Sequence, residues 1–230
     1  MKRRLLALFL LAALFFLPAE SLAKAGFKSY FSGDASSPQI AITMDDLYSM
    51  DCLEQALDLC QTYDIHMTFF ALGDVIKAED AALWQRVVDE GNEIGNHTFG
   101  HPNITKITSY QLQRQLIRTQ DALNAVLREP YTMRLFRPPF GEYDRTGYGS
   151  TEVLGSLGYH YIIMWTVCET DPDKAFKQTQ NGSILLFHTN EKDIECLETL
   201  IPRLLEAGFE PVTVSELLDL PAAEDENSGA

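Results

Sequence analysis

The chain of 230 residues carries 18 basic and 33 acidic side chains, which give it a formal net charge of −15 at pH 7. An acidic protein repels polyanions, so nucleic acid and phosphate-rich polymers are excluded as expected partners, whereas a neutral polymer or a small substrate remains open. The length suits one domain with a sizeable hydrophobic core.

The first 25 residues have the pattern of a targeting segment. Three basic residues at positions 2–4 precede an uninterrupted apolar run over residues 5–17, and small residues at Ser21, Ala23 and Ala25 fit a cleavage site. The run is short for an uncleaved membrane anchor, the alternative interpretation, because a spanning helix needs about 20 apolar residues. We predict that residues 1–25 are a signal peptide and that the protein is exported, to the periplasm or the extracellular space.

Apolar runs and helical periodicities alternate along the rest of the chain. Residues 26–37 are predicted to form an extended N-terminal arm, residues 38–220 the folded domain, and residues 221–230 a disordered acidic tail. Buried strands are predicted at residues 39–44, 66–71, 93–95, 133–136, 159–165, 183–187 and 209–214. Helices are predicted at residues 51–63 with Asp51 as the cap, and at 78–90, 108–128, 151–157 and 193–207.

This alternation of strands and helices predicts a parallel sheet, and strands that are apolar on both faces need helices to cover them. In a β/α barrel the carboxyl ends of the strands converge at one mouth, where active sites lie. An open doubly wound sheet is the alternative, with its site at the same ends. The candidate chemical groups all follow predicted strands, at Asp45, Asp46, His97, Arg137, Asp171 and His188.

Four cysteines lie at positions 52, 60, 168 and 196. Export would permit disulfides, but Cys52 and Cys60 are about 12 Å apart on the predicted helix, which is too far for one. The other pairings stay open. Because no C-x-x-C is present, the cysteines do not resemble a zinc cage, and we predict that most of them lie in the core.

His97 and His101 are four residues apart, which would place them one helical turn apart on one face. Neutral imidazole is a ligand that zinc accepts readily, although two polar loop residues would produce the same spacing. Asp45 and Asp46 end a strand, where adjacent side chains point in opposite directions. One can therefore ligate a metal while the other stays free to take a proton, unless they simply cap a helix.

Residues 137–141 (RPPFG) place a permanent cation after a strand and stiffen the following backbone with two prolines. Arg137 can hold a carboxylate, and the Phe140 backbone N–H can face a developing oxyanion; a rigid loop with a surface arginine is the alternative. His188 ends an apolar strand, and Asp171 could orient its ring. A purely structural His188 is the competing interpretation.

Together these pieces resemble the polysaccharide deacetylases, the family-four carbohydrate esterases. The resemblance covers about residues 38–218 and is carried by five motifs, at residues 43–46 (TMDD), 97–101 (HTFGH), 137–141 (RPPFG), 165–171 and 185–188 (LLFH). It implies a distorted (β/α)7 barrel.

The resemblance also implies a chemistry. Asp46, His97 and His101 would hold one divalent metal, usually zinc, with cobalt or nickel as alternatives. Asp45 would be the base acting on metal-bound water, and Arg137 would adjust the basicity of Asp45. His188 would be the acid that protonates the leaving group, supported by Asp171, while the Phe140 backbone N–H would stabilise the oxyanion. The expected partner is an N-acetylated, or O-acetylated, carbohydrate, and the oligomeric state is left open.

Two departures from the family pattern bear on the substrate. Leu47 stands where the family usually has glycine, and we expect its side chain to narrow the groove. Pro172 follows Asp171 where the family usually has tryptophan, which would remove an apolar wall for the acetyl methyl group. These departures motivate two alternatives, a carbohydrate-binding barrel without turnover and a hydrolase of non-sugar amides.

Overall fold

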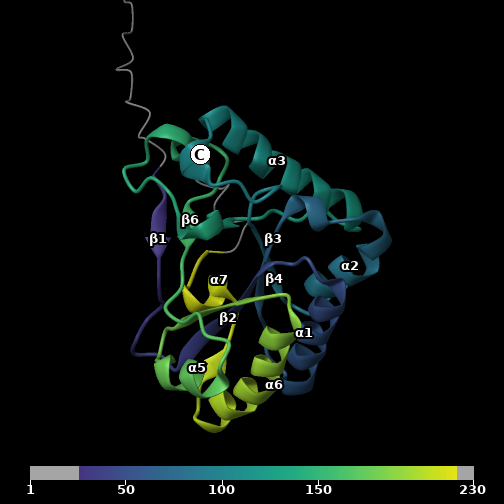
Figure 1. The fold of residues 1–230 in the computed structure, drawn as a ribbon, viewed down its shortest axis with the longest axis vertical. Helices are drawn as coiled ribbons and strands as arrows, with labels where there is room; N and C mark the ends of the chain where they lie inside the picture. The colour runs from purple at the N-terminus through teal and green to yellow at the C-terminus, as the bar shows by residue number, and fades with distance from the viewer. Residues whose placement is uncertain (1–25, 222–230) are drawn as a thin grey trace, which may run out of the picture.

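The computed structural model describes residues 26–221, and in them a sheet of parallel strands curls into a half-barrel surrounded by helices (Figure 1). This confirms the predicted parallel α/β barrel. The predicted signal peptide and residues 222–230 of the predicted tail lie outside the described residues. In the described part of the chain, no helix has both the length and the apolar character needed to cross a membrane.

The strands lie in the order β1-β6-β5-β4-β3-β2-β7, and every neighbouring pair along this path is parallel. Their bounds are Lys28–Tyr30 (β1), Gln39–Asp46 (β2), Thr68–Ala71 (β3), Glu93–Asn96 (β4), Leu135–Phe136 (β5), Tyr161–Ile163 (β6) and Ile184–His188 (β7). A short β8, Glu210–Pro211, pairs with the start of β2. The long strand β2 therefore lies between β3 and β7.

The predicted N-terminal arm is part of the sheet. Its residues form β1, which pairs in parallel with β6, so that Lys28 lies opposite Tyr161. A few residues later, Ser32 forms a bridge with Ser183, immediately before β7. The arm thus contacts strands at both ends of the curled sheet, and its extended backbone satisfies hydrogen-bonding groups that an open edge would leave exposed.

Helices cover the outer side of the sheet, with α3, α2, α1 and α6 following one another along one side in Figure 1. The helices are Met50–Tyr63 (α1), Ala81–Asp89 (α2), Ser109–Val126 (α3), Val153–Ser156 (α4), Pro172–Gln178 (α5), Glu191–Glu206 (α6) and Val214–Leu217 (α7). The cap of α1 is Ser49, whose hydroxyl accepts the Cys52 N–H, and not Asp51 as predicted. Helix α5 was not predicted; it begins at Pro172, where the missing backbone N–H costs nothing.

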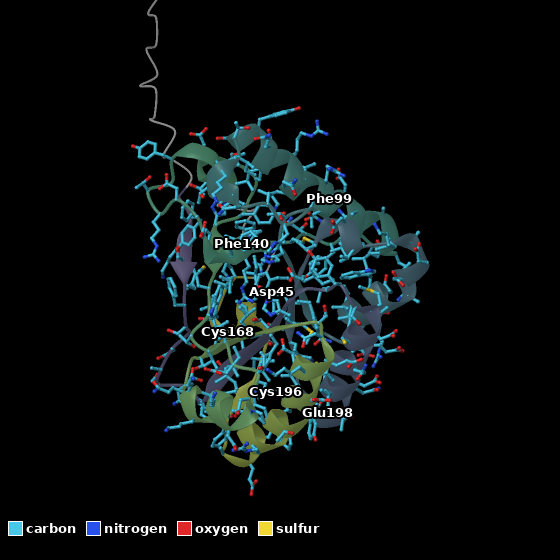
Figure 2. The ribbon with its side chains drawn as sticks, in the orientation of Figure 1. Asp45, Phe99, Phe140, Cys168, Cys196 and Glu198 are labelled. Carbon is cyan, nitrogen blue, oxygen red and sulfur yellow. The ribbon has the colours of Figure 1, made fainter. Side chains whose placement is uncertain are left out.

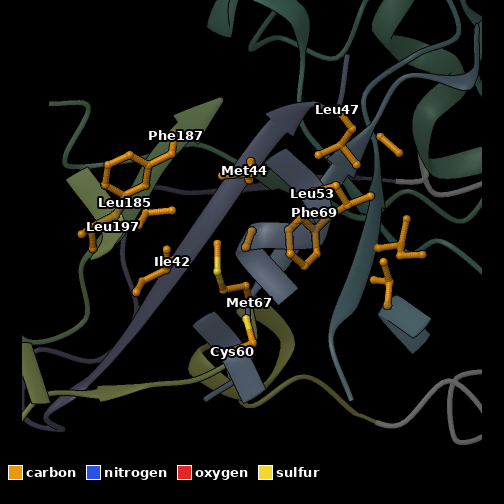
Figure 3. Close-up of a cluster of buried hydrophobic side chains, with 14 of the residues drawn as sticks. Ile42, Met44, Leu47, Leu53, Cys60, Met67, Phe69, Leu185, Phe187 and Leu197 are labelled. Atoms are coloured by element: carbon orange, nitrogen blue, oxygen red, sulfur yellow. The ribbon is translucent and has the colours of Figure 1, made fainter. Parts of the chain in front are cut away.

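The core lies between β2, its neighbouring strands and the covering helices. Figure 3 shows Ile42 and Met44 of β2 beside Leu185 and Phe187 of β7 and Leu197 of α6. All five side chains are buried, and each stabilises the fold by roughly 1.5–3 kcal/mol relative to an exposed position. This packing keeps the carboxyl ends of β2 and β7 side by side.

The four cysteines are all free thiols, and three of them are buried as predicted. The exception is Cys168, which is exposed in the segment between β6 and β7. Burial raises the pKa of Cys60 to about 12 and that of Cys196 to about 11, so these two thiols stay protonated at neutral pH.

Candidate metal centre and active site

Strand register brings distant polar residues to one edge of the sheet. Asp45 of β2 lies directly opposite His188 of β7, and Asp46 lies opposite Ala71 of β3. Ala71 in turn lies opposite Asn96 of β4, and His97 follows Asn96 directly. Figure 2 shows Asp45 near the middle of the view, with Phe140 above it and Cys168 below it. The carboxyl ends of β4, β2 and β7, with β3 between β4 and β2, therefore bring these polar residues together.

The predicted metal ligands come together. Oδ1 of Asp46 lies 3.5 Å from Nε2 of His97 and 3.5 Å from Nε2 of His101, and one ligand atom from each residue lies within 4.8 Å of the others. The Asp46 Oδ1 atom is buried and has no hydrogen-bond partner. An orphaned buried oxygen facing two imidazole nitrogens is unfavourable unless a cation or a donor fills the space.

The imidazoles present the nitrogens that a metal would need. His97 Nδ1 lies 2.7 Å from the Arg137 carbonyl oxygen, which can only accept, so Nδ1 carries a proton and Nε2 is the ring nitrogen that faces Asp46. Burial and the neighbouring His97 lower the pKa of His101, which favours its neutral form. Although burial opposes it, the pKa of Asp46 is lowered overall by His97, His101 and His188. These donors fit a divalent metal such as zinc.

Asp45 is held by Arg137, a fully buried arginine from the loop after β5. Its Nη1 donates to Asp45 Oδ1 at 2.7 Å and to the Thr43 hydroxyl at 2.7 Å. Its Nε and Nη2 donate to the carbonyl oxygens of Ile163 and Met164 at 3.1 and 3.2 Å. Burial lowers the pKa of Arg137 and Asp45 opposes this, so the guanidinium remains charged. The alternative of a surface arginine is wrong.

Most of the described non-glycine residues with left-handed backbone lie around the site. Of seven described non-glycine residues with positive φ, five lie there: Asp46, Leu47, Thr98, His101 and Phe140. Such conformations cost of order 1–3 kcal/mol each and persist where surrounding contacts enforce them. The two histidines are consequently not a turn apart on a helix, as their spacing suggested, but lie on a tight loop after β4.

Gln115 of α3 supports this loop, a role that sequence patterns did not reveal. Its Oε1 accepts the backbone N–H groups of Phe99 and Gly100, both at 2.8 Å. The Arg118 guanidinium, one turn further along α3, lies 3.6 Å above the Phe99 ring. Gln115 and Arg118 are two polar residues three positions apart on a predicted helix. This pattern is common on exposed helix faces, so it does not predict a contact with the histidine loop.

The Phe140 turn lies against His101, one of the predicted metal ligands. Its ring packs edge-on against His101, with the centroids 4.5 Å apart, while most of the side chain remains exposed. Gly141 adopts a φ of 67°, and a Cβ at this position would lie 2.9 Å from the Trp165 ring. The Trp165 ring thus packs against the turn and, together with the positive φ, restricts position 141 to glycine.

The structure corrects the predicted partner of His188. Asp171 is an exposed cap at the start of α5, where its Oδ1 accepts the N–H groups of Asp173 and Lys174 at 3.0 and 3.1 Å. Pro172 starts the helix directly after it and thereby holds the carboxylate at this end. The carboxylate beside His188 is instead that of Asp193, which lies five residues after His188, in the first turn of α6.

Leu47 does not narrow the groove, contrary to the expectation from sequence. Its side chain is fully buried and belongs to the main core cluster, where Figure 3 shows it just beyond the end of β2, near Leu53. With φ at 65°, the residue turns its side chain into the core and away from the mouth.

Comparison with known proteins agrees with this geometry. The family model for polysaccharide deacetylase matches residues 32–162. The chain belongs to the polysaccharide deacetylase family. It is thus placed in a family of hydrolases whose named members act on carbon–nitrogen bonds of acetylated glycans.

Individual relatives are similar over most of this chain. The peptidoglycan-N-acetylglucosamine deacetylase of Bacillus cereus is 28% identical, over 81% of this chain and 70% of that protein. The uncharacterised protein YlxY of Bacillus subtilis is 26% identical, over 82% of this chain and only 60% of the relative. A solved structure from Bacillus anthracis, described as a pseudoenzyme of the family, has a TM-score of 0.73 and 26% identity over 84% of this chain and 69% of that one.

Proposed function

We propose that the protein is an exported, metal-dependent deacetylase that removes the acetyl group from an N-acetylated sugar. The observation that carries the proposal is the register between β2 and β7. It places Asp45 opposite His188, next to the Asp46, His97 and His101 cluster. A carboxylate and an imidazole beside a candidate metal centre are the groups that amide hydrolysis requires.

A divalent metal held by the three ligands would supply Lewis acidity. It would lower the pKa of water so that the water could lose a proton at neutral pH and attack the amide carbon. Asp45 takes the proton from the attacking water, because Arg137 holds its Oδ1 and leaves Oδ2, which lies 3.8 Å from His97 Nε2, on the metal side. His188 gives a proton to the leaving amine. The turn at Phe140 supplies a backbone N–H to the developing oxyanion.

The substrate proposal rests on the named relatives and on the export signal. Relatives that act on N-acetylglucosamine and on N-acetylmuramic acid in peptidoglycan match this chain at 27–29% identity. We therefore propose a glycan strand of the cell envelope as substrate. The exposed aromatic side chains of Tyr48 and Phe140, next to Asp46 and His101, provide apolar surfaces for sugar rings.

Acetate release tests the proposal. The mature protein would be stripped of metal, reloaded with zinc or cobalt, and incubated with N-acetylglucosamine oligomers, peptidoglycan fragments, acetyl-xylan and small N-acetyl amides. We expect metal-dependent release from the N-acetylated glycans that is lost in Asp45→Asn. Release from small amides alone would support the non-sugar alternative. Metal binding without any release would place the protein with the pseudoenzyme that it resembles.

A further inference from the structure

The Asp193 carboxylate lies directly beside His188. It is almost fully buried, and its Oδ2 accepts the His188 backbone N–H at 2.7 Å and the Asn190 side-chain amide at 3.0 Å. The same oxygen lies 3.8 Å from Nδ1 of the His188 ring. The other oxygen, Oδ1, is buried without a hydrogen-bond partner, so the carboxylate has capacity for another donor.

Helix capping accounts for only part of this arrangement. Asn190 is the N-cap of α6, and its own side chain accepts the Asp193 backbone N–H at 3.0 Å. A carboxylate that serves only as a cap can stay in water, as Asp171 does at the start of α5. Burying a carboxylate is unfavourable unless a positive group lies close, and the structure places the His188 ring within ion-pair distance.

We propose that Asp193 is the positioning residue for His188 and takes the role that the sequence motif suggested for Asp171. By facing Nδ1, the carboxylate selects the ring tautomer protonated there and leaves Nε2 to exchange a proton with the substrate. The meaning of this contact for catalysis rests on the proposed function, whereas the contact itself does not.

The charges around His188 set the expected pH dependence. Its pKa is raised, first by the interaction with Asp193 on α6 and, against the effect of burial, also by Asp45 and Asp46 on β2. A metal cation at Asp46 would oppose the contribution from β2. Removing the negative charge of Asp193 should lower the pKa of His188. Because His188 acts as an acid only when protonated, the alkaline limb of the kcat/KM profile should then move to lower pH.

The test is the Asp193→Asn variant of the full-length mature chain loaded with zinc. Asparagine keeps an oxygen that can accept the His188 N–H but carries no charge. Asp171→Asn tests the competing carboxylate, and Asp173→Asn, an exposed residue of α5, controls for loss of one surface charge. Two measurements would be made across pH: imidazole ¹⁵N NMR of His188, and kcat/KM for acetate release.

We expect His188 to titrate at lower pH in Asp193→Asn and to lose its preference for the Nδ1-protonated tautomer, with kcat reduced about 10- to 100-fold. Asp171→Asn and Asp173→Asn should match the wild type in both measurements. An unchanged titration and tautomer in Asp193→Asn, or a shift in Asp171→Asn, would overturn the proposal.

Two further readouts keep the test decisive. If thermal unfolding shows that Asp193→Asn does not fold, ¹³C NMR of the wild-type Asp193 carboxylate replaces it. That signal should show a step at the pH where His188 titrates, and a signal without this step would contradict the contact. If the wild type releases no acetate from any substrate, the proposed function fails, while the NMR titration still decides the role of Asp193.

Discussion

The metal side and the acid side of the site are built in different ways. On the metal side, Asp46 is the last residue of β2, and His97 and His101 belong to the loop that directly follows β4. On the acid side, His188 also ends a strand, but the carboxylate beside it comes from the first turn of α6. Its position depends on how a helix packs against the barrel.

This difference explains why the sequence brought together the three residues of the metal side but named a different carboxylate for the acid side. Parallel strands have a fixed register, so a strand-end motif places its side chains at the mouth wherever it lies in the sequence. A helix can begin one or two residues earlier or later without disturbing its own hydrogen bonds. Which of two acidic helix starts approaches His188 is therefore decided by tertiary packing.

The two sides should respond oppositely to the loss of a histidine. Removing a ligand in His101→Ala should weaken zinc binding by at least about 100-fold, since outer-shell changes alone cost 10- to 100-fold. His188→Ala should keep its zinc but lose about 10²–10⁴-fold in kcat, because only proton donation is removed. Zinc content by atomic absorption and acetate release measure both effects. Loss of zinc in His188→Ala would show that the two sides are not separate.

Arg137 connects Asp45 to the metal side, because it holds the Asp45 carboxylate and presents its carbonyl oxygen to His97. Arg137→Met should lower the free energy of unfolding by about 3–5 kcal/mol, since it leaves a buried carboxylate without its cation. The matched substitution Arg203→Met, at an exposed ion pair with Asp173, should change it by less than about 1 kcal/mol. Urea unfolding compares the two. Similar losses in both variants would mean that the buried Arg137–Asp45 pair contributes no more to the free energy of unfolding than the Arg203–Asp173 pair does.

Leu47 tests whether the first loop of the metal side is shaped by the core. Leu47→Ala should lose roughly 2–5 kcal/mol of stability by emptying its buried site while keeping the left-handed φ of 65°. Leu47→Gly relieves the backbone strain and should be the more stable of the two, by up to about 1 kcal/mol. Urea unfolding measures the order, and kcat per folded molecule should stay unchanged in both. A clear gain in kcat for Leu47→Gly would restore the view that Leu47 obstructs the groove.

Gln115 should affect the metal side alone. Gln115→Ala leaves the Phe99 and Gly100 N–H groups without their acceptor, and we expect zinc affinity to fall about tenfold as the histidine loop loosens. The titration of His188 should not move. Arg114→Ala, at an exposed position one residue earlier on α3, is the control and should leave zinc affinity unchanged. An equal loss in both variants, measured by competition with a zinc chelator, would contradict the specific role.

The sequence by itself determined the class of fold and which polar residues gather at its mouth. Alternating apolar strands and helices can bury both faces of a sheet only in a parallel α/β arrangement, and strand-end residues then meet at one mouth. The grouping of the candidate metal ligands with Asp45 and Arg137 could be predicted for that reason. The arm at residues 26–37 could be predicted as extended, but its pairing with β6 is a long-range contact that local pattern does not encode.

Tertiary structure decided the features that depend on where a side chain is buried. Leu47 was expected in the groove because its family position is there, but its left-handed backbone turns it into the core. Asp171 and Asp193 are both acidic residues at helix starts, and only packing makes one an exposed cap and the other a buried neighbour of His188. A sequence pattern predicts which segments form strands and helices, whereas strand partners and the surroundings of a side chain are set by segments far away in the chain.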